Sequence, residues 1–441
     1  MTTTEELYQI YLQHPVISTD TRKIAQGCLF FALKGDRFDA NTFAAQAIEA
    51  GAAYAIIDNA EYRLNDKCLL VKDVLTTLQD LARHHRRQLT IPVVGLTGSN
   101  GKTTTKELIN AVLSQHFKTL ATQGNLNNHI GVPLTVLTIG ASHQMAVIEM
   151  GANHQKEIEL LCTISQPSHG LITNVGRAQL EGFGGPEGVK IGKGELYDYL
   201  AKNGIAFINS NSEDLMQMQA ARPFVHPPVF YGNGKNSRVS GEITGNDPLL
   251  TLRWTDNSNG QSHTVKTNLT GAYNLDNILA AITIGIHFGL SAEEINKGIE
   301  GYVPSNNRSQ ITKTAYNTLI CDYYNANPSS MAVAIENIGK LQAGKKIMIL
   351  GDMFEMGDDA AAEHADIIRK AIAIDADEAV FIGKEFSDAG MSGGFTLSDK
   401  TKFYMTVEEA IAGFKANPVK DATVLIKGSR GMALERLVEF F

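Results

Sequence analysis

The sequence predicts an α/β protein of three consecutive domains. Its 441 residues are enough for about three domains of ordinary size. Short apolar, β-branched runs alternate with stretches of helical periodicity along most of the chain. One such run leads through a glycine-containing turn into a helix, which is typical of a phosphate-binding loop. We therefore expect a small α/β domain over residues 1–90, a central α/β domain of the P-loop ATPase type over 91–304, and a Rossmann-like domain over 305–441.

The composition is that of an ordinary globular protein. Hydrophobic residues make up 43% of the chain and charged residues 20%, which allows an ample core. The formal net charge of −8 argues against a nucleic-acid partner, because that binding normally requires a basic surface. Four cysteines lie far apart and indicate neither a zinc site nor a disulfide framework. The first residues lack the features of a signal peptide, and no run could span a bilayer. We expect a monomeric cytoplasmic protein that is not inserted in a membrane.

The first predicted domain alternates short strands and helices. A buried strand is expected over 28–33, a helix over 43–50 and a strand over 53–57. A polar turn before the first strand could hold a nucleotide or a phosphate group, or be a simple capped turn, through Ser18, Asp20, Thr21 and Arg22. The domain ends in a basic cluster, residues 83–87, which we interpret as the solvated C-terminus of a helix.

The central domain opens with the loop TGSNGKTTTK, residues 97–106. The apolar segment 91–96 before it predicts a buried strand, and the residues after it recur at helical spacing. Glycines in the loop let backbone N–H groups converge on phosphate oxygens at the positive end of the helix. The common longer pattern would place glycine at position 96, where this chain has Leu96. The loop therefore predicts a nucleoside triphosphate site made by Gly98, Ser99, Asn100, Gly101, Lys102, Thr103 and Thr104.

Two side chains of this loop are expected to bind the phosphates and Mg²⁺, and a carboxylate that follows later in the chain is expected to bind the metal as well. Lys102 would reach the β- and γ-phosphates, and the Thr103 hydroxyl would hold Mg²⁺. The segment 146–150 predicts a strand that carries Glu149 to its carboxyl end. The metal-binding acid of a P-loop enzyme belongs there, because ligands bind at the carboxyl ends of parallel strands.

The remainder of the central domain is less uniform. A strand and turn are expected over 170–176, and the glycine turn 182–185 leads into a helix that carries Lys193. Residues 209–270 are strand-like but poorly periodic, and a helix starts within 271–277.

The third domain repeats the α/β alternation. Strands are expected at 319–321, 346–350, 379–382 and 423–426, with helical stretches between them, so we predict a parallel sheet. No G-x-G-x-x-G follows the first of these strands, so a dinucleotide is not indicated. Three such domains with one phosphate loop suggest closure around a shared cleft.

Several motifs together carry a family resemblance that extends over essentially the whole chain. They are TGSNGKTT at the phosphate loop, IEMGAN at 148–153, TNVG at 173–176, GAYNLDN at 271–277 and NNRSQ at 306–310. With these motifs the chain resembles the Mur ligases, ATP-dependent amide-bond ligases that build the peptide stem of the bacterial cell wall. Residues 322–331, 350–357 and 427–432 look like the member that adds D-alanyl-D-alanine to UDP-N-acetylmuramoyl-tripeptide. Residues 17–43 resemble its uridine-nucleotide-binding domain.

The resemblance implies a reaction through an acyl phosphate. The γ-phosphoryl group of ATP would move to the terminal carboxylate of the UDP-linked tripeptide, and the amine of the dipeptide would then displace phosphate. Because carboxylate and triphosphate repel each other, the site needs positive charge from Lys102, from Mg²⁺ on Thr103 and Glu149, and from a second Mg²⁺. In the family a lysine after the glycine turn is carbamoylated and holds that second metal, and Lys193 matches it.

The resemblance also implies roles for other residues. Adenine and ribose would face Asn274 and Asn277, and the nucleotide would meet Arg308 and Asp322. The peptide substrates would contact Asn125, Asn127, Asn325, Asn327, Lys427 and Arg430. The first domain would bind the uridine diphosphate through its polar turn.

Two departures from the family pattern affect these expectations. After TNVG the family usually has Glu-Ala-His, whose histidine helps bind metal, whereas this chain has Arg177-Ala178-Gln179. A glutamine carbonyl is a neutral oxygen ligand that Mg²⁺ accepts, so Gln179 is a candidate metal ligand, although weaker than a carboxylate. The first domain has Asp39-Ala40-Asn41 where family members often have Asp-Gly-His.

Other functions compete with this one. Folylpolyglutamate synthetase is a ligase of the same superfamily but usually lacks the uridine-binding domain. The ligase that adds the third stem residue carries an Asp-Asn-Pro-Arg motif, which this sequence lacks. A P-loop switch ATPase would hydrolyse ATP without an amine acceptor. A structural protein is disfavoured, because it would not need Lys102, Glu149 and Lys193 at the ends of separate elements.

Overall fold

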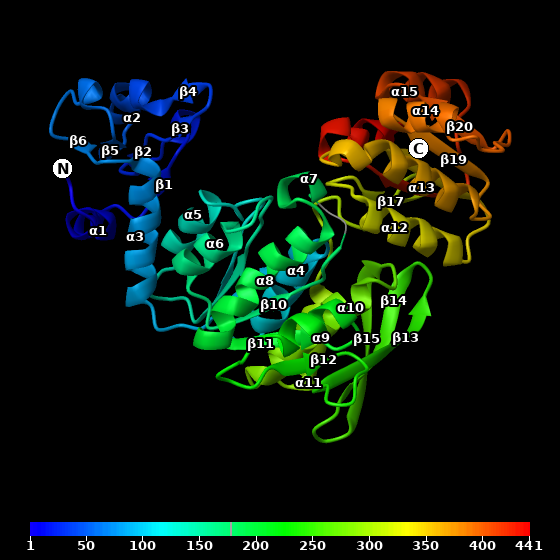
Figure 1. Ribbon diagram of the computed structural model, residues 1–441, viewed down its shortest axis with the longest axis horizontal. Coiled ribbons are helices and arrows are strands. Elements are labelled where there is room, and N and C mark those ends of the chain that lie inside the picture. The colour runs from blue at the N-terminus through cyan, green and yellow to red at the C-terminus, as the bar shows by residue number, and fades with distance from the viewer. Residues whose placement is uncertain (177–178) are drawn as a thin grey trace.

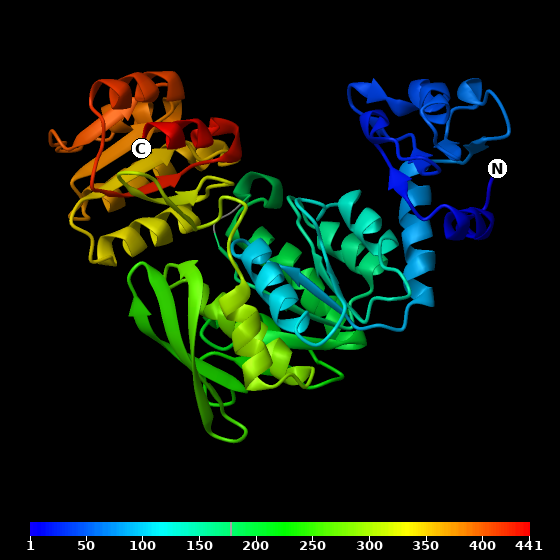
Figure 2. The same ribbon diagram turned by 180° about the vertical axis from the view of Figure 1, so that it is seen from behind.

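Within the described residues, the three larger sheets divide the chain into three α/β units, as the sequence predicts. The computed structural model describes residues 1–176 and 179–441. The first and third sheets lie at opposite ends of the molecule, on either side of the central sheet (Figures 1 and 2). Among the described residues, no helix is both long and apolar enough to cross a membrane.

The first unit is a small parallel sheet with strand order β1-β2-β5-β6. Its apolar strands are buried between helices, and Phe30 and Phe31 are completely covered. Asn41, at the departure from the family pattern, is also buried and bonds to Asp39 and Asp58. The elements are α1 (Thr4–Gln13), β1 (Ile17–Ser18), β2 (Leu29–Phe31), β3 (Lys34–Gly35), β4 (Phe38–Asp39), α2 (Ala44–Glu49), β5 (Tyr54–Ile57) and β6 (Cys68–Leu70).

Helix α3 (Val74–Gln88) attaches the first unit to the central one. It packs against α5 (Gly131–Leu137) and α6 (Glu157–Ser165). The expectation that its basic end is solvated is wrong for His85 and Arg86, which are buried. Arg86 donates from Nε to the Ser165 carbonyl (2.8 Å) and from Nη2 to the Gln166 carbonyl (3.1 Å). The guanidinium thus satisfies carbonyls that the end of α6 leaves without helical partners.

The central sheet has nine strands in the order β15-β14-β13-β12-β11-β10-β7-β9-β8. Strands β7 to β12 are parallel, and β13, β14 and β15 extend the sheet with antiparallel pairs. This extension is the poorly periodic region 209–270. The strands are β7 (Val93–Thr97), β8 (Thr119–Ala121), β9 (Met145–Glu149), β10 (His169–Ile172), β11 (Ile205–Asn209), β12 (Val229–Tyr231), β13 (Val239–Asn246), β14 (Leu249–Asp256) and β15 (Gln261–Thr270). The remaining helices are α4 (Lys102–Leu113), α7 (Leu180–Phe183), α8 (Pro186–Asn203), α9 (Glu213–Ala220), α10 (Asn274–His287) and α11 (Ala292–Gly301).

The third unit is a six-stranded sheet with order β16-β17-β21-β18-β19-β20. The four predicted strands are present and parallel, and β16 is an antiparallel edge strand. The strands are β16 (Gln310–Lys313), β17 (Thr318–Asp322), β18 (Lys346–Gly351), β19 (Glu378–Ile382), β20 (Thr401–Tyr404) and β21 (Thr423–Lys427). The helices are α12 (Pro328–Lys340), α13 (Ala360–Ile372), α14 (Lys384–Ser392) and α15 (Val407–Ala416).

Candidate active site

A cavity of about 660 Å³ lies between the central unit and the third unit. Its walls come from the phosphate loop, from the ends of β9 and β10, and from the start of α10 on the central side. On the other side they come from the loops after β17 and β18. Most of the site residues predicted from the sequence meet here: Ser99, Asn100, Gly101, Lys102, Thr103, Thr104, Asn125, Asn127, Glu149, Gln179, Asn274, Asn277, Arg308, Asp322, Asn325, Asn327 and Lys427.

The phosphate loop is held in shape by the loop after β10. The φ angles of Gly98 and Gly101 are +146° and +76°, in the range that side chains disfavour. A Cβ on Gly98 would lie 2.0 Å from Thr173 Oγ1. That hydroxyl donates to the Asn100 carbonyl at 2.6 Å, so the two loops are joined at their closest point. Leu96, where the longer pattern has glycine, is fully buried in β7. The shorter loop therefore starts directly from a core strand.

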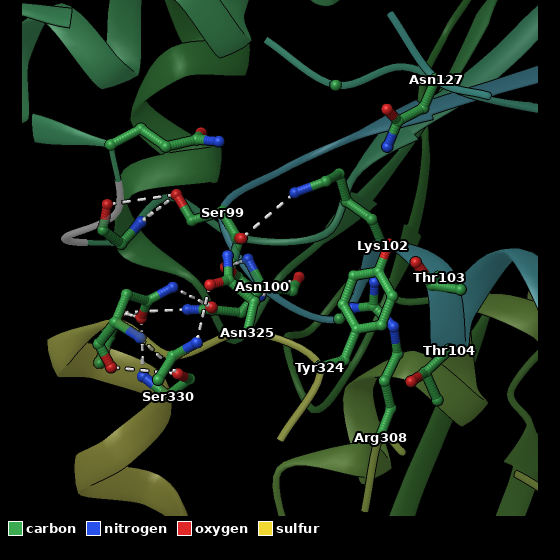
Figure 3. Close-up of a pocket in the computed structure, with 18 of the residues that line it drawn as sticks. Ser99, Asn100, Lys102, Thr103, Thr104, Asn127, Arg308, Tyr324, Asn325 and Ser330 are labelled. Atoms are coloured by element: carbon green, nitrogen blue, oxygen red, sulfur yellow. Dashed lines mark hydrogen bonds between the residues drawn. The ribbon is translucent and has the colours of Figure 1, made fainter. Parts of the chain in front are cut away.

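Lys102 is the first residue of α4 and points back over its own loop (Figure 3). Its Nζ donates to the carbonyls of Gly98 (2.6 Å) and Ser99 (3.2 Å). Burial lowers the pKa of Lys102 to about 8, although the nearby Glu149 carboxylate opposes that shift. The amine therefore lies at the phosphate loop with only carbonyl partners, which a phosphate oxygen could replace.

Glu149 has a carboxylate oxygen that is free to bind a cation. Its Oε1 accepts from Asn127 Nδ2 at 2.8 Å. Its Oε2 is buried and has no hydrogen-bond partner within the described residues 1–176 and 179–441. An unpartnered buried carboxylate oxygen is costly unless a cation or donor joins it. With the Thr103 side chain lining the same cavity, these oxygens fit the preference of Mg²⁺ for hard ligands.

Of the two residues predicted to hold a second metal, one lines the cavity and the other is buried behind its wall. Gln179 lines the cavity and donates from Nε2 to Asn153 Oδ1 at 2.7 Å. The preceding residues 177–178 of the same sequence motif lie outside the described residues. Lys193 on α8 is completely buried behind the cavity wall, where its Nζ donates to the Ala152 carbonyl at 3.1 Å. Burial, reinforced by the positive charge of Lys102, lowers the pKa of Lys193 well below its ordinary value.

Asn274 and Asn277 form the wall at the start of α10. Both are buried, and Asn277 Nδ2 donates to Asn274 Oδ1 at 2.9 Å. Asn277 Oδ1 accepts from Thr105 Oγ1 at 3.0 Å. A Cβ on Gly101 would lie only 2.8 Å from the same Oδ1. These amides therefore also support the start of α4, besides facing the cavity.

The third unit contributes two charged groups to the cavity wall: an arginine stacked on a tyrosine ring and a lysine–aspartate ion pair. The Arg308 guanidinium lies 3.9 Å from the centre of the Tyr324 ring. Lys427 is almost fully buried and its Nζ donates to Asp322 Oδ2 at 2.6 Å. Asp322 Oδ1 also accepts from the Ser309 N–H at 3.2 Å. Lys427 is thus positioned by Asp322 at the carboxyl ends of two adjacent strands.

Some predicted residues do not line this cavity. Arg430 lies outside it, with its Nη1 3.5 Å from Glu435. The polar turn of the first unit is also separate from it, because the first unit lies at the opposite end of the molecule from the third unit (Figure 1). There Arg22 is exposed and bonds through Nε and Nη2 to the two oxygens of Asp20, which lowers the pKa of Asp20 to about 2. The roles predicted for these side chains remain predictions.

Several residues of the cavity wall were not predicted from the sequence. Asn174 accepts from the Asn100 N–H at 3.0 Å, and Tyr324 supports Arg308. Ser329 and Ser330 belong to the first turn of α12. The sequence could have placed the two serines at a helix start, because an asparagine followed by proline and two serines is typical of a helix N-terminus.

Family models match the three units in order. The Mur ligase family catalytic domain matches residues 15–86, the Mur ligase middle domain 96–285, and the Mur ligase glutamate ligase domain 307–430. The chain belongs to the Mur ligase family. As a Mur ligase it is an ATP-dependent enzyme that forms a peptide bond.

Individual members resemble this Mur ligase over nearly their whole length. The UDP-N-acetylmuramoyl-tripeptide–D-alanyl-D-alanine ligases of Escherichia coli and Bacillus subtilis are each 36% identical to it, over 96% of this chain and 92% of theirs. The crystal structure of MurF from Acinetobacter baumannii has a TM-score of 0.87 and 34% identity, covering 96% of this chain and 92% of that one. MurF from Thermotoga maritima, whose structure contains ADP, has a TM-score of 0.85 and 25% identity, covering 97% and 96%.

Proposed function

We propose that this Mur ligase adds D-alanyl-D-alanine to UDP-N-acetylmuramoyl-tripeptide, with ATP converted to ADP and phosphate, in the synthesis of peptidoglycan precursors. The observation that carries the chemistry is that one cavity joins the phosphate loop of the central unit to the polar ends of β17 and β21. The choice of substrates is supported by the ligases of that name that share 36% identity over nearly the whole chain.

The cavity suits phosphoryl transfer followed by attack of an amine. Lys102 would exchange its loop carbonyls for the β- and γ-phosphates and offset their charge as the tripeptide carboxylate approaches. The carboxylate oxygen attacks the γ-phosphorus, which gives an acyl phosphate and ADP. The dipeptide amine then attacks the acyl carbon, a C–N bond forms, and phosphate leaves with the electrons of the C–O bond. Asn325, Asn327 and Lys427 would orient the peptide groups from the third unit.

Mg²⁺ would be held by Glu149 and Thr103, with Gln179 and a carbamoylated Lys193 contributing to a second site. The metal would supply positive charge at the phosphate oxygens. The unpartnered Glu149 Oε2 supports the first site. The lowered pKa of Lys193 supports carbamoylation, because only a neutral amine reacts with CO₂.

The three units divide the work in this proposal. Residues 1–90 would bind the uridine diphosphate through Ser18, Asp20, Thr21 and Arg22, residues 91–304 would bind ATP, and residues 305–441 would complete the ligation site with Arg308 and Asp322 at the nucleotide and Arg430 at the peptide. The enzyme would act as a monomer in the cytoplasm, where ATP is present.

The test is mass spectrometry of the product formed from ATP, the UDP-tripeptide and D-alanyl-D-alanine. We expect the UDP-pentapeptide, with phosphate released only when both substrates are present. Phosphate release from ATP without the dipeptide would instead indicate a switch ATPase, and transfer of another amino acid would indicate a different ligase of the family.

A further inference from the structure

The side chain of Asn100 points away from its own loop and into the third unit. Its backbone is fixed on the central side, since its N–H donates to Asn174 Oδ1 and its carbonyl accepts from Thr173 and Asn174. Its amide group instead contacts the first turn of α12, as the dashed lines around Asn100 in Figure 3 show. A residue of the nucleotide loop therefore has two distinct sets of partners.

These contacts form a closed ring of three hydrogen bonds, which we call the Asn100 ring. Asn100 Nδ2 donates to Ser329 Oγ (3.0 Å), and Ser329 Oγ donates to Asn327 Oδ1 (3.0 Å). Asn327 Nδ2 then donates to Asn100 Oδ1 (2.8 Å). Within the ring each side chain donates once and accepts once, so the three side chains are linked without any other side chain between them.

The surrounding structure fits the Asn100 ring closely. A Cβ on Gly176 would lie 2.9 Å from Ser329 Oγ, so a side chain at position 176 would force this hydroxyl to shift. Asn327 Oδ1 also accepts from the Ser330 N–H at 2.9 Å and caps α12. The ring is therefore attached directly to the start of α12.

Further along α12 a second polar contact reaches the central unit. Asn337 Oδ1 accepts from Asn246 at 3.3 Å, and its Nδ2 donates to Thr270 Oγ1 at 3.4 Å. Both distances are long for hydrogen bonds, so the Asn100 ring makes the shorter polar contacts between α12 and the central unit. Neutral amide and hydroxyl bonds exchange readily with water, which suits an interface that opens and closes.

We propose that Asn100 is a positioning residue whose side chain docks the third domain onto the phosphate loop through Asn327 and Ser329. The backbone of the loop and Lys102 would then bind the nucleotide, while the Asn100 side-chain amide binds the third domain. Docking sets where Asn325 and Lys427 stand relative to the phosphates. This inference depends on ATP-dependent ligation, which the family provides, and not on the identity of the peptide substrates.

A cysteine pair tests whether the contact exists in solution. The four native cysteines are buried, whereas Asn100 and Ser329 are half-buried, so Asn100→Cys with Ser329→Cys introduces the only thiols in the described part of the chain that are not buried. The control pair is Asn100→Cys with Glu336→Cys, which places the second thiol on the exposed face of α12. Under mild oxidation we expect an intramolecular disulfide for the first pair and little for the control. Equal yields for the two pairs, or none for either, would overturn the proposal.

Kinetics test whether the contact matters to the reaction. One intramolecular hydrogen bond is worth roughly a fivefold effect. We expect Asn100→Ala and Ser329→Ala each to lower kcat about fivefold or more, and the double variant to be no slower than the slower single one, because one loss already opens the ring. Ser329→Thr keeps the hydroxyl and should stay close to the native rate.

The control is Asn110→Ala, which removes an amide from α4 away from the cavity and should leave kcat unchanged. Independent, multiplying losses in the double variant would contradict a shared ring. So would a native rate in Ser329→Ala with an unchanged melting temperature. Because the disulfide assay needs no substrate, the docking contact and the proposed substrates can fail separately.

Discussion

Two lysines of the central unit show how position decides what an amine does. Lys102 and Lys106 are one turn apart on α4. Lys106 is completely buried, donates to the Thr122 carbonyl at 2.5 Å and pairs with Glu107, so its amine is used by the fold. Lys102 lines the cavity and bonds only to carbonyls of its own loop. Of these two lysines, we therefore propose that Lys102 acts on the phosphates.

The corresponding prediction is a separation of activity from stability. Lys102→Ala should abolish turnover while leaving the melting temperature nearly unchanged, because the loss of transition-state charge stabilisation is typically several kcal/mol. Lys106→Ala should lower the melting temperature, because it leaves a cavity and an unpaired carbonyl in the core. Phosphate release and calorimetry on both variants check this. Near-normal turnover by folded Lys102→Ala would contradict the assignment.

Lys193 presents a different case, because its burial favours the neutral amine. A charged lysine would repel Mg²⁺, whereas a carbamate would offer two oxygens with negative charge. We predict that Lys193→Ala loses most activity, that short carboxylic acids restore part of it, and that Lys193→Arg stays inactive. The control is Lys190→Ala on the same helix, where Lys190 pairs at the surface with Glu187 and Asp214. Full activity of Lys193→Ala, or no added CO₂ mass on the native protein, would refute the idea.

At the scale of elements, local pattern predicted the strands and helices whose apolar period is unbroken. The strand, loop and helix around Lys102 are one example, and the four inner strands of the third sheet are another. The edge strands β16 and β20 were not predicted, because they are only partly buried and carry little apolar signal. Sequence also could not show that Arg86 is buried, since its partners come from α6 and the loop after it, far along the chain.

In the candidate site, too, local motifs were predicted from the sequence, whereas contacts between distant segments were not. The loop motif identified Asn100 as a nucleotide residue, but the direction of its amide depends on where α12 lies. The contact between these segments spans more than two hundred residues of sequence. Such a pairing is determined by tertiary packing, so no local periodicity in the sequence predicts it.

The packing of β10 against α10 creates an acid-sensitive pair. His169 Nε2 lies 3.2 Å from His287 Nε2, with Phe207 and Phe288 beside the rings. Burial, reinforced by His287, lowers the pKa of His169 to about 4. Burial, reinforced by Arg238, also lowers the pKa of His287. The folded protein therefore resists proton uptake at both imidazoles.

This arrangement predicts a loss of stability in mild acid. Between the ordinary histidine pKa near ~6.5 and the folded value of about 4, the unfolded chain binds a proton that folded His169 does not, so stability falls as pH falls through that window. Linkage gives about 2 kcal/mol at pH 5. His169→Phe should reduce the fall in melting temperature between pH 7 and pH 5. An equal fall in the variant would show that other groups cause it.

At the scale of the whole molecule, the first and central units form one connected body. A single buried apolar cluster contains Leu29 of the first sheet, Leu81 of α3 and Val132 of α5. Tyr11 of α1 also donates to the Leu137 carbonyl at 2.5 Å. The third sheet has separate apolar clusters on its two faces. We infer that the third unit can move as a body while the first two keep their relation.

This organisation separates the expected uridine site from the ATP site, which gives a selective prediction. Arg22 is largely exposed and does not line the cavity beside Lys102. Arg22→Ala should therefore raise KM for the UDP-tripeptide and leave KM for ATP nearly unchanged, because the lost charge would contact only the diphosphate. Arg63→Ala removes another exposed cation of the same unit and should change neither value. The loss should be largest at low salt, because exposed charges are screened as ionic strength rises. An equal rise in both KM values would point to misfolding of the variant or to a different site for the uridine diphosphate.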